Sequence, residues 1–405
     1  MSAYTIVANV GTSMATATGR PGQGHLVYAS QTGLGNWWLF YLSSTASLSA
    51  VTSSDFSSWA GPSSGSPMSL AQGHNSEGRN FAFSYQYNAT YTEQIVHMVS
   101  TYLISGNTYT YHSRFTLGST WTQTNSEAST GTNYTQGDYT FESGCVTTLD
   151  SSFYPVDVSP YWAISKHVNG EQEIAIASNS DTGTTWTSGF GTPAGIGSLG
   201  SYITSNAIFS LGSRNLIVIS DNGVVPPSGG SFSNLQWATW NGSSLSSASN
   251  VFGSALTTTD ANAWGAVART TSDIHVVALS DNSSNYTHYR FNGTSWSAGN
   301  TIPSLAYGTN SGIFLATDGT SVWAFAIDTS HTVQFTQWNG SAWSAWSDAA
   351  INSSAATYLS GCQQVQSGSI GLVWTLADGS NYDIAGTLFN TVPGFPVGAI
   401  SCSVP

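Results

Sequence analysis

Candidate catalytic residues gather in one part of the sequence. All six glutamates lie between Glu77 and Glu173, and half of the eight histidines lie in or beside the same stretch. Arg79, Arg114 and Lys166 add positive charge there. Carboxyl and imidazole groups transfer protons near neutral pH, and guanidinium groups bind carboxylates. These residue types together are typical of a site that acts on an acidic sugar.

The segment Gly73–Arg79 concentrates this chemistry just before an apolar strand expected over 81–85. A loop that leads into the innermost strand of such a sheet would line a central pocket. There His74, Glu77 and Arg79 would serve as base, acid and anion clamp. The competing interpretation is that the glutamates mark one divergent, solvent-facing pair of repeats.

A polysaccharide lyase is the first reaction that these residues fit. It removes the proton next to a uronate carboxylate, and it needs a His or Tyr base and an Arg or His that neutralises the acid. His74, His97 or Tyr154 would be the base, with Arg79 or Arg114 as the neutralising group. In its residue types this set resembles that of uronate lyases.

A glycoside hydrolase is the second reaction, since it needs two carboxylates flanking one bond. Glu77 with Glu142, or either of them with Asp138, would supply that pair. A sialidase fits poorly. Arg20 lies where its first carboxylate-binding arginine is expected, but no glutamate follows Glu173 to form the late Tyr–Glu pair.

Four residues are predicted to bind substrate: Trp37, His112, Arg114 and Lys166. His112 and Arg114 are two apart in a strand pattern, so they face the same side of a sheet and could hold a carboxylate. A polar outer face, opposite Tyr111 and Phe115, is the preferred interpretation for this pair. An exposed Trp37 ring would stack on the apolar face of a sugar.

The composition excludes several other classes of protein. The chain has 405 residues, a formal charge of −13 and only 7% charged residues, with 13% aromatic residues. Coiled coils and helical solenoids need far more Glu, Lys and Arg. One lysine and six arginines cannot form the basic face of a nucleic-acid binder. The aromatic content is that of a folded core, so charge-driven disorder is excluded as well.

A short motif repeats along the chain and organises it. Six segments end alike: Phe56-Ser-Ser-Trp59, Gly118-Ser-Thr-Trp121, Gly183-Thr-Thr-Trp186, Gly242-Ser-Ser-Leu245, Gly293-Thr-Ser-Trp296 and Gly340-Ser-Ala-Trp343. Their last residues are 47 to 65 positions apart, so the chain has room for seven units. A short apolar strand recurs in step, over 37–42, 81–85, 161–165, 216–219, 274–279, 322–327 and 370–376.

These repeats predict an all-β protein. Asn-Gly pairs supply the positive φ angles of tight turns, and the tryptophan would start the next strand. A four-stranded sheet cannot bury both faces alone, so the chain is predicted to form one domain over 1–405, a seven-bladed β-propeller with about four antiparallel strands per blade. Two stacked β-sandwiches are the alternative. A long insertion is expected over about 122–155, between blades two and three.

One copy of the motif resembles a known family. Asp181-Thr-Gly183-Thr-Thr185-Trp186 is similar to the Asp-box of sialidase-type propellers, although Asn179 stands where that pattern has a serine. The other copies keep only the Gly-x-x-Trp half. Asp-boxes are structural turns on the outside of blades, so the resemblance implies the fold and not an activity.

A glycan is the expected partner under each of three hypotheses. A glycan-cleaving enzyme is preferred to a lectin that only binds. A lectin would also be rich in Trp, Tyr and Asn, but its equivalent pockets would repeat the same polar residues in every blade. An attachment protein of a virion or cell surface is the third reading. We expect no nucleic acid, no membrane insertion, a monomer, and no required cofactor, although strand-end aspartates would suit a Ca²⁺ ion in the central channel.

The cysteines and the N-terminus bear on the compartment. Cys362 and Cys402 would close a loop with Cys145 left free, or all three would be buried thiols. Met1 to Gly19 has no basic residue and no sustained apolar run, so it does not read as a secretion signal. We expect an extracellular protein whose signal has been replaced by Met1, or a protein on a virion surface.

Overall fold

The computed structural model confirms that the protein is all-β. It describes residues 4–11, 17–18, 24–29, 36–44, 47–62, 68–69, 81–88, 93–104, 107–118, 121–129, 143–146, 161–168, 171–178, 206–212, 215–223, 232–241, 246–256, 260, 263–281, 283–352 and 354–391, for some strands as backbone alone. In this part of the chain the strands form six four-stranded sheets and one three-stranded sheet, all antiparallel. No helix able to cross a membrane occurs among these residues.

The sheets are built from consecutive strands. The first three are β2-β3-β4-β5 (Leu26–Ala29, Asn36–Ser44, Ser47–Ser53, Met68–Ser69), β6-β7-β8-β9 (Phe81–Asn88, Glu93–Ile104, Asn107–Leu117, Trp121–Ser129) and β10-β11-β12 (Ser143–Val146, Tyr161–Val168, Glu171–Ser178). The next three are β13-β14-β15-β16 (Asn206–Gly212, Asn215–Gly223, Phe232–Trp240, Ser249–Asn250), β17-β18-β19-β20 (Trp264–Thr270, Asp273–Leu279, Tyr286–Phe291, Trp296–Ala298) and β21-β22-β23-β24 (Ile313–Thr317, Val322–Ile327, Val333–Trp338, Ser347–Ala350).

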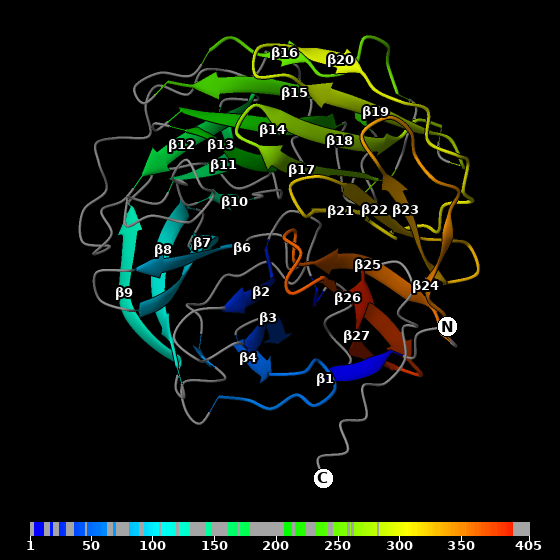
Figure 1. The fold of residues 1–405 in the computed structure, drawn as a ribbon. Coiled ribbons are helices and arrows are strands. Elements are labelled where there is room, and N and C mark those ends of the chain that lie inside the picture. Colours follow the sequence, from blue (N-terminus) through cyan, green and yellow to red (C-terminus); the bar gives the residue numbers. More distant parts are fainter. Residues whose placement is uncertain are drawn as a thin grey trace.

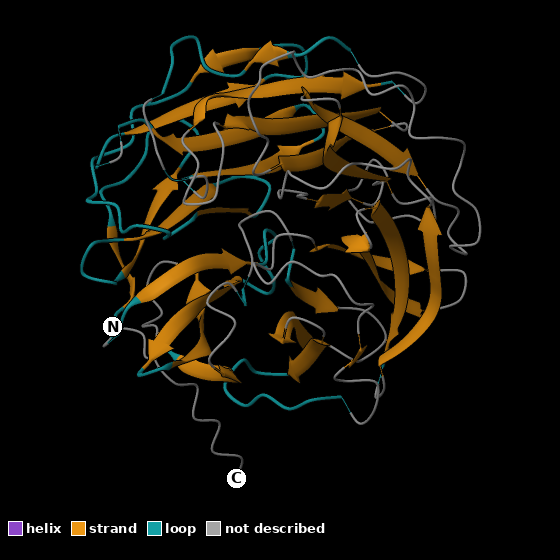
Figure 2. Ribbon diagram, turned by 180° about the vertical axis from the view of Figure 1, so that it is seen from behind, coloured by secondary structure: helices purple, strands orange, loops and turns teal. Residues whose placement is uncertain are grey.

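The last sheet joins the two ends of the chain. Its order is β1-β27-β26-β25 (Thr5–Gly11, Asn381–Asn390, Ser369–Asp378, Ala356–Gly361), so the N-terminal strand completes a sheet of C-terminal strands. Figures 1 and 2 show the sheets following one another around a common centre in chain order. This radial arrangement is that of a β-propeller, closed by pairing between the first and last strands.

The repeated Gly-x-x-Trp motif forms one kind of turn. Asn339 Oδ1 accepts hydrogen bonds from the N–H groups of Ser341 and Ala342, at 3.0 and 3.1 Å, and Gly340 has a φ of 102°. Asn292 makes the equivalent bonds one sheet earlier. A capping side chain followed by a residue with positive φ is typical of a tight turn between antiparallel strands.

The first copy keeps this turn without its glycine. Asp55 Oδ1 accepts a hydrogen bond from Ser57 N at 2.8 Å, and Phe56 takes the glycine position with a φ of 64°. The buried Phe56 ring packs against Trp37 and Trp59, with centroids 5.2 and 4.9 Å away. Packing of the ring offsets a backbone strain of about 1–3 kcal/mol. The copies ending at Trp186 and Leu245 lie outside the described residues, as does the Asp-box-like segment.

The seven predicted apolar strands all form, with one difference in position. Six fall on β3, β11, β14, β18, β22 and β26, each the second strand of its sheet. The strand predicted over 81–85 is β6, the first strand of its sheet, and β7 is the equivalent second strand. First and second strands are both buried on two faces, so their sequences look alike.

The predicted insertion over 122–155 is not wholly an insertion. β9 occupies 121–129 and β10 occupies 143–146, and each is a regular member of its sheet. The wide spacing between the predicted strands 81–85 and 161–165 arises partly because the first lies on β6, a first strand, and the second on β11, a second strand. β9 is an edge strand, where polar residues such as those of 122–129 are normal. Its sequence therefore lacks the apolar pattern that predicts a strand.

The hydrophobic core lies between neighbouring sheets. One cluster joins β17–β20 to β21–β24, and it contains Val277, Leu315 and Trp343. Another joins β21–β24 to the closing sheet around Trp374. The first strands approach closely near the centre, because a Cβ on Gly265 of β17 would lie 2.1 Å from the carbonyl oxygen of Ile313 on β21. Each sheet is therefore stabilised mainly by its neighbours.

Candidate functional site

Most of the predicted catalytic residues cannot be placed. His74, Glu77, Arg79, Glu142 and Tyr154 lie outside the described residues. Lys166 lies on β11, opposite Glu173 on β12. His112 lies on β8, with Val99 opposite it on β7 and Glu127 on β9.

The register of β7 and β8 brings two predicted site residues together. His97 on β7 lies directly opposite Arg114 on β8, with Ser84 of β6 on its other side. The row continues to Asn125 on β9. These two residues are 17 positions apart in the sequence, and only strand pairing makes them neighbours.

Trp37 lies in the core. Its side chain is 4% exposed, and its ring lies 4.8 Å from Tyr28 and 5.2 Å from Phe56. A Cβ on Gly371 of the closing sheet would lie 2.6 Å from the indole ring. Trp37 therefore packs between the first and closing sheets, and its position gives no support to sugar stacking.

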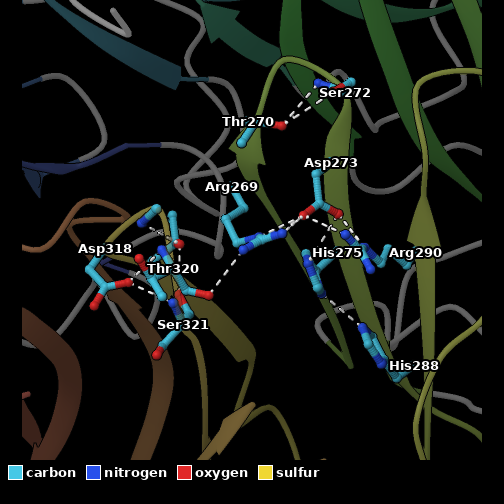
Figure 3. Close-up of polar contacts among 12 residues, drawn as sticks. Arg269, Thr270, Ser272, Asp273, His275, His288, Arg290, Asp318, Thr320 and Ser321 are labelled. Carbon is cyan, nitrogen blue, oxygen red and sulfur yellow. Dashed lines mark hydrogen bonds and ion pairs between the residues drawn. The ribbon is translucent and has the colours of Figure 1, made fainter. Parts of the chain in front are cut away.

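The structure reveals a polar cluster that the sequence analysis did not select (Figure 3). Asp273 begins β18 and is flanked by two arginines, Arg269 from β17 and Arg290 from β19. Arg269 Nε donates to Asp273 Oδ2 at 2.6 Å, and Arg290 Nη2 donates to the same oxygen at 3.0 Å. Arg290 Nε donates to the other carboxylate oxygen. The 7% exposed carboxylate is thus held between two guanidinium groups.

Two histidines extend this cluster into the core. His275 Nε2 lies 3.3 Å from Asp273 Oδ1, and His275 Nδ1 lies 2.9 Å from His288 Nε2. Trp343 Nε1, from the next sheet, donates to His288 Nδ1 at 3.2 Å. The side chains of this relay follow one another from the edge of β18 to the interface between two sheets.

The hydrogen bonds assign one tautomer to each histidine. An indole Nε1 can only donate, so His288 Nδ1 accepts and the proton of a neutral His288 is on Nε2. His288 Nε2 then donates to His275 Nδ1, which leaves the His275 proton on Nε2, facing Asp273. Both imidazoles are neutral in this arrangement. The hydrogen bonds run in one direction from Trp343 to His275, whose Nε2 lies 3.3 Å from Asp273 Oδ1.

The directions of the pKa shifts agree with neutral histidines and an ionised aspartate. Burial lowers the pKa of His275, more than the nearby Asp273 carboxylate, which favours the protonated ring, raises it. Burial and the neighbouring His275 lower the pKa of His288 to about 3. Burial raises the pKa of Asp273, but bonds from His275, Arg290 and Arg269 outweigh it and hold that pKa below its ordinary value.

The Trp338 ring packs against the guanidinium groups of both arginines. Each guanidinium carbon lies 5.5 Å from the centre of its ring, and Trp338 Nε1 donates to Asn300 Oδ1 at 2.9 Å. Arg269 Nη1 also donates to Thr320 O at 3.1 Å, in the β21–β22 hairpin. The cluster therefore ties two sheets together as well as holding two positive charges in place.

A weak signal for this cluster existed in the sequence. Asp273 and His275 are two apart on β18, and His288 and Arg290 are two apart on β19, which is the spacing of side chains on one face of a strand. This half of the chain has few basic residues, so the pair of spacings does not stand out as a concentration of charge. Three or more His, Cys, Asp or Glu side chains suited to a metal ion are not grouped anywhere in the described ranges.

Comparisons with known proteins place the fold. No protein-family model and no curated protein sequence matches the chain. In structure, the chain is similar to a polysaccharide lyase of family PL25, an ulvan lyase bound to -[GlcA(1-4)Rha3S]-, with 12% identity, a TM-score of 0.56, and 95% of this chain and 96% of that chain covered. It is also similar to the lectin BP39L from Burkholderia pseudomallei, with 11% identity, a TM-score of 0.59, and 94% and 97% covered. The similar structures are carbohydrate-active proteins and lectins of the propeller class.

Proposed function

We propose that this protein is a carbohydrate-active β-propeller of seven blades that cleaves an acidic polysaccharide. The observation that carries the proposal is the row in which His97 lies opposite Arg114. It pairs a candidate base with a candidate carboxylate partner, in a fold shared over nearly its whole length with a polysaccharide lyase. The seven sheets are the seven blades of this proposal.

A lyase reaction needs both of these groups. The base takes the proton on the carbon next to the uronate carboxylate, a double bond forms to the neighbouring carbon, and the glycosidic oxygen leaves with a proton. An arginine beside the carboxylate stabilises the charge that develops there. We assign the base to His97 or His74, with Tyr154 as an alternative, and the neutralising charge to Arg114 or Arg79.

A glycoside hydrolase is the second form of this proposal. Glu77 and Glu142 would flank the bond, one as acid and the other as nucleophile or base. His112 and Lys166 would bind the substrate in either form. A hydrolase adds water across the glycosidic bond, so its products have a new reducing end and no double bond.

A lectin is the competing function. The full-length similarity to BP39L favours it, because that structure is a lectin of the same fold. An attachment protein on a virion or cell surface would bind glycans through the same surfaces. An acidic chain with few charges suits an extracellular setting for each of these functions. A monomer without a required cofactor, with Ca²⁺ as an optional channel ion, completes the proposal.

The repeated turn supports kinship with Asp-box propellers. In the described copies the capping side chain is Asn or Asp and the next residue has positive φ. In the Asp-box-like segment the residue directly before Gly183 is Thr182, so Thr182 would take this capping position and Asp181 would precede it. This proposal concerns the fold and leaves the reaction to the residues above.

An activity screen on anionic polysaccharides, run beside a glycan-array assay, tests the proposal. Rising ultraviolet absorbance from unsaturated uronate ends indicates a lyase, and new reducing ends without that absorbance indicate a hydrolase. Binding with neither product indicates a lectin. The absence of both cleavage and binding overturns the proposed function.

A further inference from the structure

Positive charge is scarce in this protein, and two of its seven basic residues meet at one point. Arg269 and Arg290 flank Asp273, in a chain with 20 acidic residues. His275 and His288 are neutral, so the cluster carries a net charge of one positive unit. Asp318, in the next hairpin, caps the N–H groups of Thr320 and Ser321 and forms no ion pair with either arginine.

The two arginines differ in what remains available to a ligand. Each nitrogen of the Arg269 guanidinium contacts Asp273 or Thr320, and its side chain is 21% exposed. Arg290 uses Nε and Nη2 for Asp273, and its side chain is 41% exposed. Among the described residues, Arg290 Nη1 has no hydrogen-bond acceptor. The Nη1 edge of the fixed Arg290 guanidinium therefore remains open to solvent.

The surroundings hold Arg290 ready for an anion. Two hydrogen bonds to Asp273 and the Trp338 ring fix the guanidinium plane, so little side-chain entropy is lost when a ligand binds. Ser297 lies opposite Arg290 on β20 and is exposed, so the two side chains share one face of the sheet. A guanidinium and a hydroxyl together suit a carboxylate or a sulfate ester.

We propose that Arg290, supported by Asp273 and Trp338, binds an oxyanion of an acidic polysaccharide at the edge of the interface between β17–β20 and β21–β24. The polysaccharide rests on the proposed function, whereas the oxyanion site rests on the arginines alone. Arg290 lies on a different sheet from His97 and Arg114, so it would hold the substrate chain at a second point.

Binding of dextran sulfate, polygalacturonate and neutral dextran to the full-length protein at 0.15 M NaCl tests the proposal. At that salt concentration charges beyond about 8 Å are screened, so binding reports on local groups. We expect wild-type protein to bind at least one of the two anionic polymers, and Arg290→Gln to weaken that binding about tenfold or more. Neutral dextran should not bind in this way. The polymer that responds distinguishes sulfate from carboxylate.

Arg214→Gln is the matched control, since it removes the same charge from the connection between β13 and β14. Arg290→Lys keeps the charge without the fork, and should recover only part of the affinity. Equal binding by Arg290→Gln and wild type overturns the proposal, and so does an equal loss in Arg214→Gln. Binding of neither anionic polymer by wild type also overturns it. Cleavage is measured separately, so an inactive protein that binds through Arg290 refutes only the proposed function.

Discussion

His275 and His288 lie with their rings nearly parallel, 10° apart, and are joined by a 2.9 Å contact between Nδ1 and Nε2. His275 is completely buried and His288 is 3% exposed. Trp343 donates to His288 at one end of this relay, and the Asp273 carboxylate lies 3.3 Å from His275 Nε2 at the other, so the contacts connect two sheets. A proton added to either ring removes an acceptor and breaks this relay.

The first prediction concerns acid stability. The pKa of His288 is lowered to about 3 and that of His275 is lowered as well, so below pH about 6.5 the unfolded chain binds protons that the native protein does not. The free energy of unfolding should therefore be full above that pH and fall as the pH drops toward 4, by about 1 kcal/mol per pH unit for His288, with a further loss in the same direction from His275. Urea titrations at pH 7.5, 6.5 and 5.5 measure this.

His288→Gln should flatten that pH dependence, and His331→Asn is its control. His331 lies in a turn at a φ of 63°, which Asn tolerates. An unchanged slope in His288→Gln would show that the relay does not set acid stability. His25 is also buried, with a pKa of about 4, so part of the slope should remain.

The second prediction isolates the indole hydrogen bond. Trp343→Phe keeps a large ring but leaves His288 Nδ1 without its donor, which should lower stability by about 1–3 kcal/mol beyond the loss of ring volume. Trp296→Phe is the matched control, because Trp296 Nε1 is buried without a hydrogen-bond partner in the described structure. Thermal denaturation of both variants should show the larger loss for Trp343→Phe. Equal losses of stability in the two variants would show that the hydrogen bond from Trp343 to His288 does not stabilise the protein.

The third prediction uses a close backbone approach. A Cβ on Gly299 would lie 2.1 Å from His288 Nδ1, where the ring is held by two hydrogen bonds. Gly299→Ala should therefore displace the ring and destabilise the protein by about 1–3 kcal/mol. Gly253→Ala should be nearly neutral, since its Cβ would meet only Tyr289 Oη at 3.5 Å. Chemical denaturation compares the two, and a neutral Gly299→Ala would show that the His288 ring is free to move.

The fourth prediction concerns the proposed reaction. His74→Ala and Glu77→Gln should each abolish cleavage or glycan binding while the melting temperature stays nearly unchanged, if these residues act on substrate. Glu93→Gln, at the start of β7, makes the same change in charge outside the proposed site and should remain active. Loss of several degrees in melting temperature with function intact would make His74 and Glu77 structural residues.

The fifth prediction addresses the repeated turn. Asn339→Ala removes the acceptor for two backbone N–H groups and should cost about 1 kcal/mol. Gly340→Ala should be similarly unfavourable, because its φ of 102° strains any residue with a Cβ. Differential scanning calorimetry measures both. A stabilised Gly340→Ala would contradict the assigned turn.

The repeat architecture was accessible from the sequence. Apolar strands recurred with Asn, Asp and Gly at their ends, and these residues act locally, since turn chemistry depends on the side chain and φ of neighbouring positions. The same local rules could not tell β6 from β7, or recognise β9, because burial on both faces and an edge position leave no distinct pattern. The sequence predicts a binding role for Trp37, whereas the packing of one sheet on another buries it in the core.

Composition and local patterns alone indicate a repeated all-β fold closed into a ring, an acidic chain with few charges, and the residue types available for chemistry. The meeting of Arg269, Asp273 and Arg290 follows instead from the fold, because their contacts depend on the register of β17, β18 and β19. The link from His288 to Trp343 spans 55 residues and two sheets. Periodicity reports which face of a strand is buried, whereas a cluster of this kind depends on which sheet packs against that face.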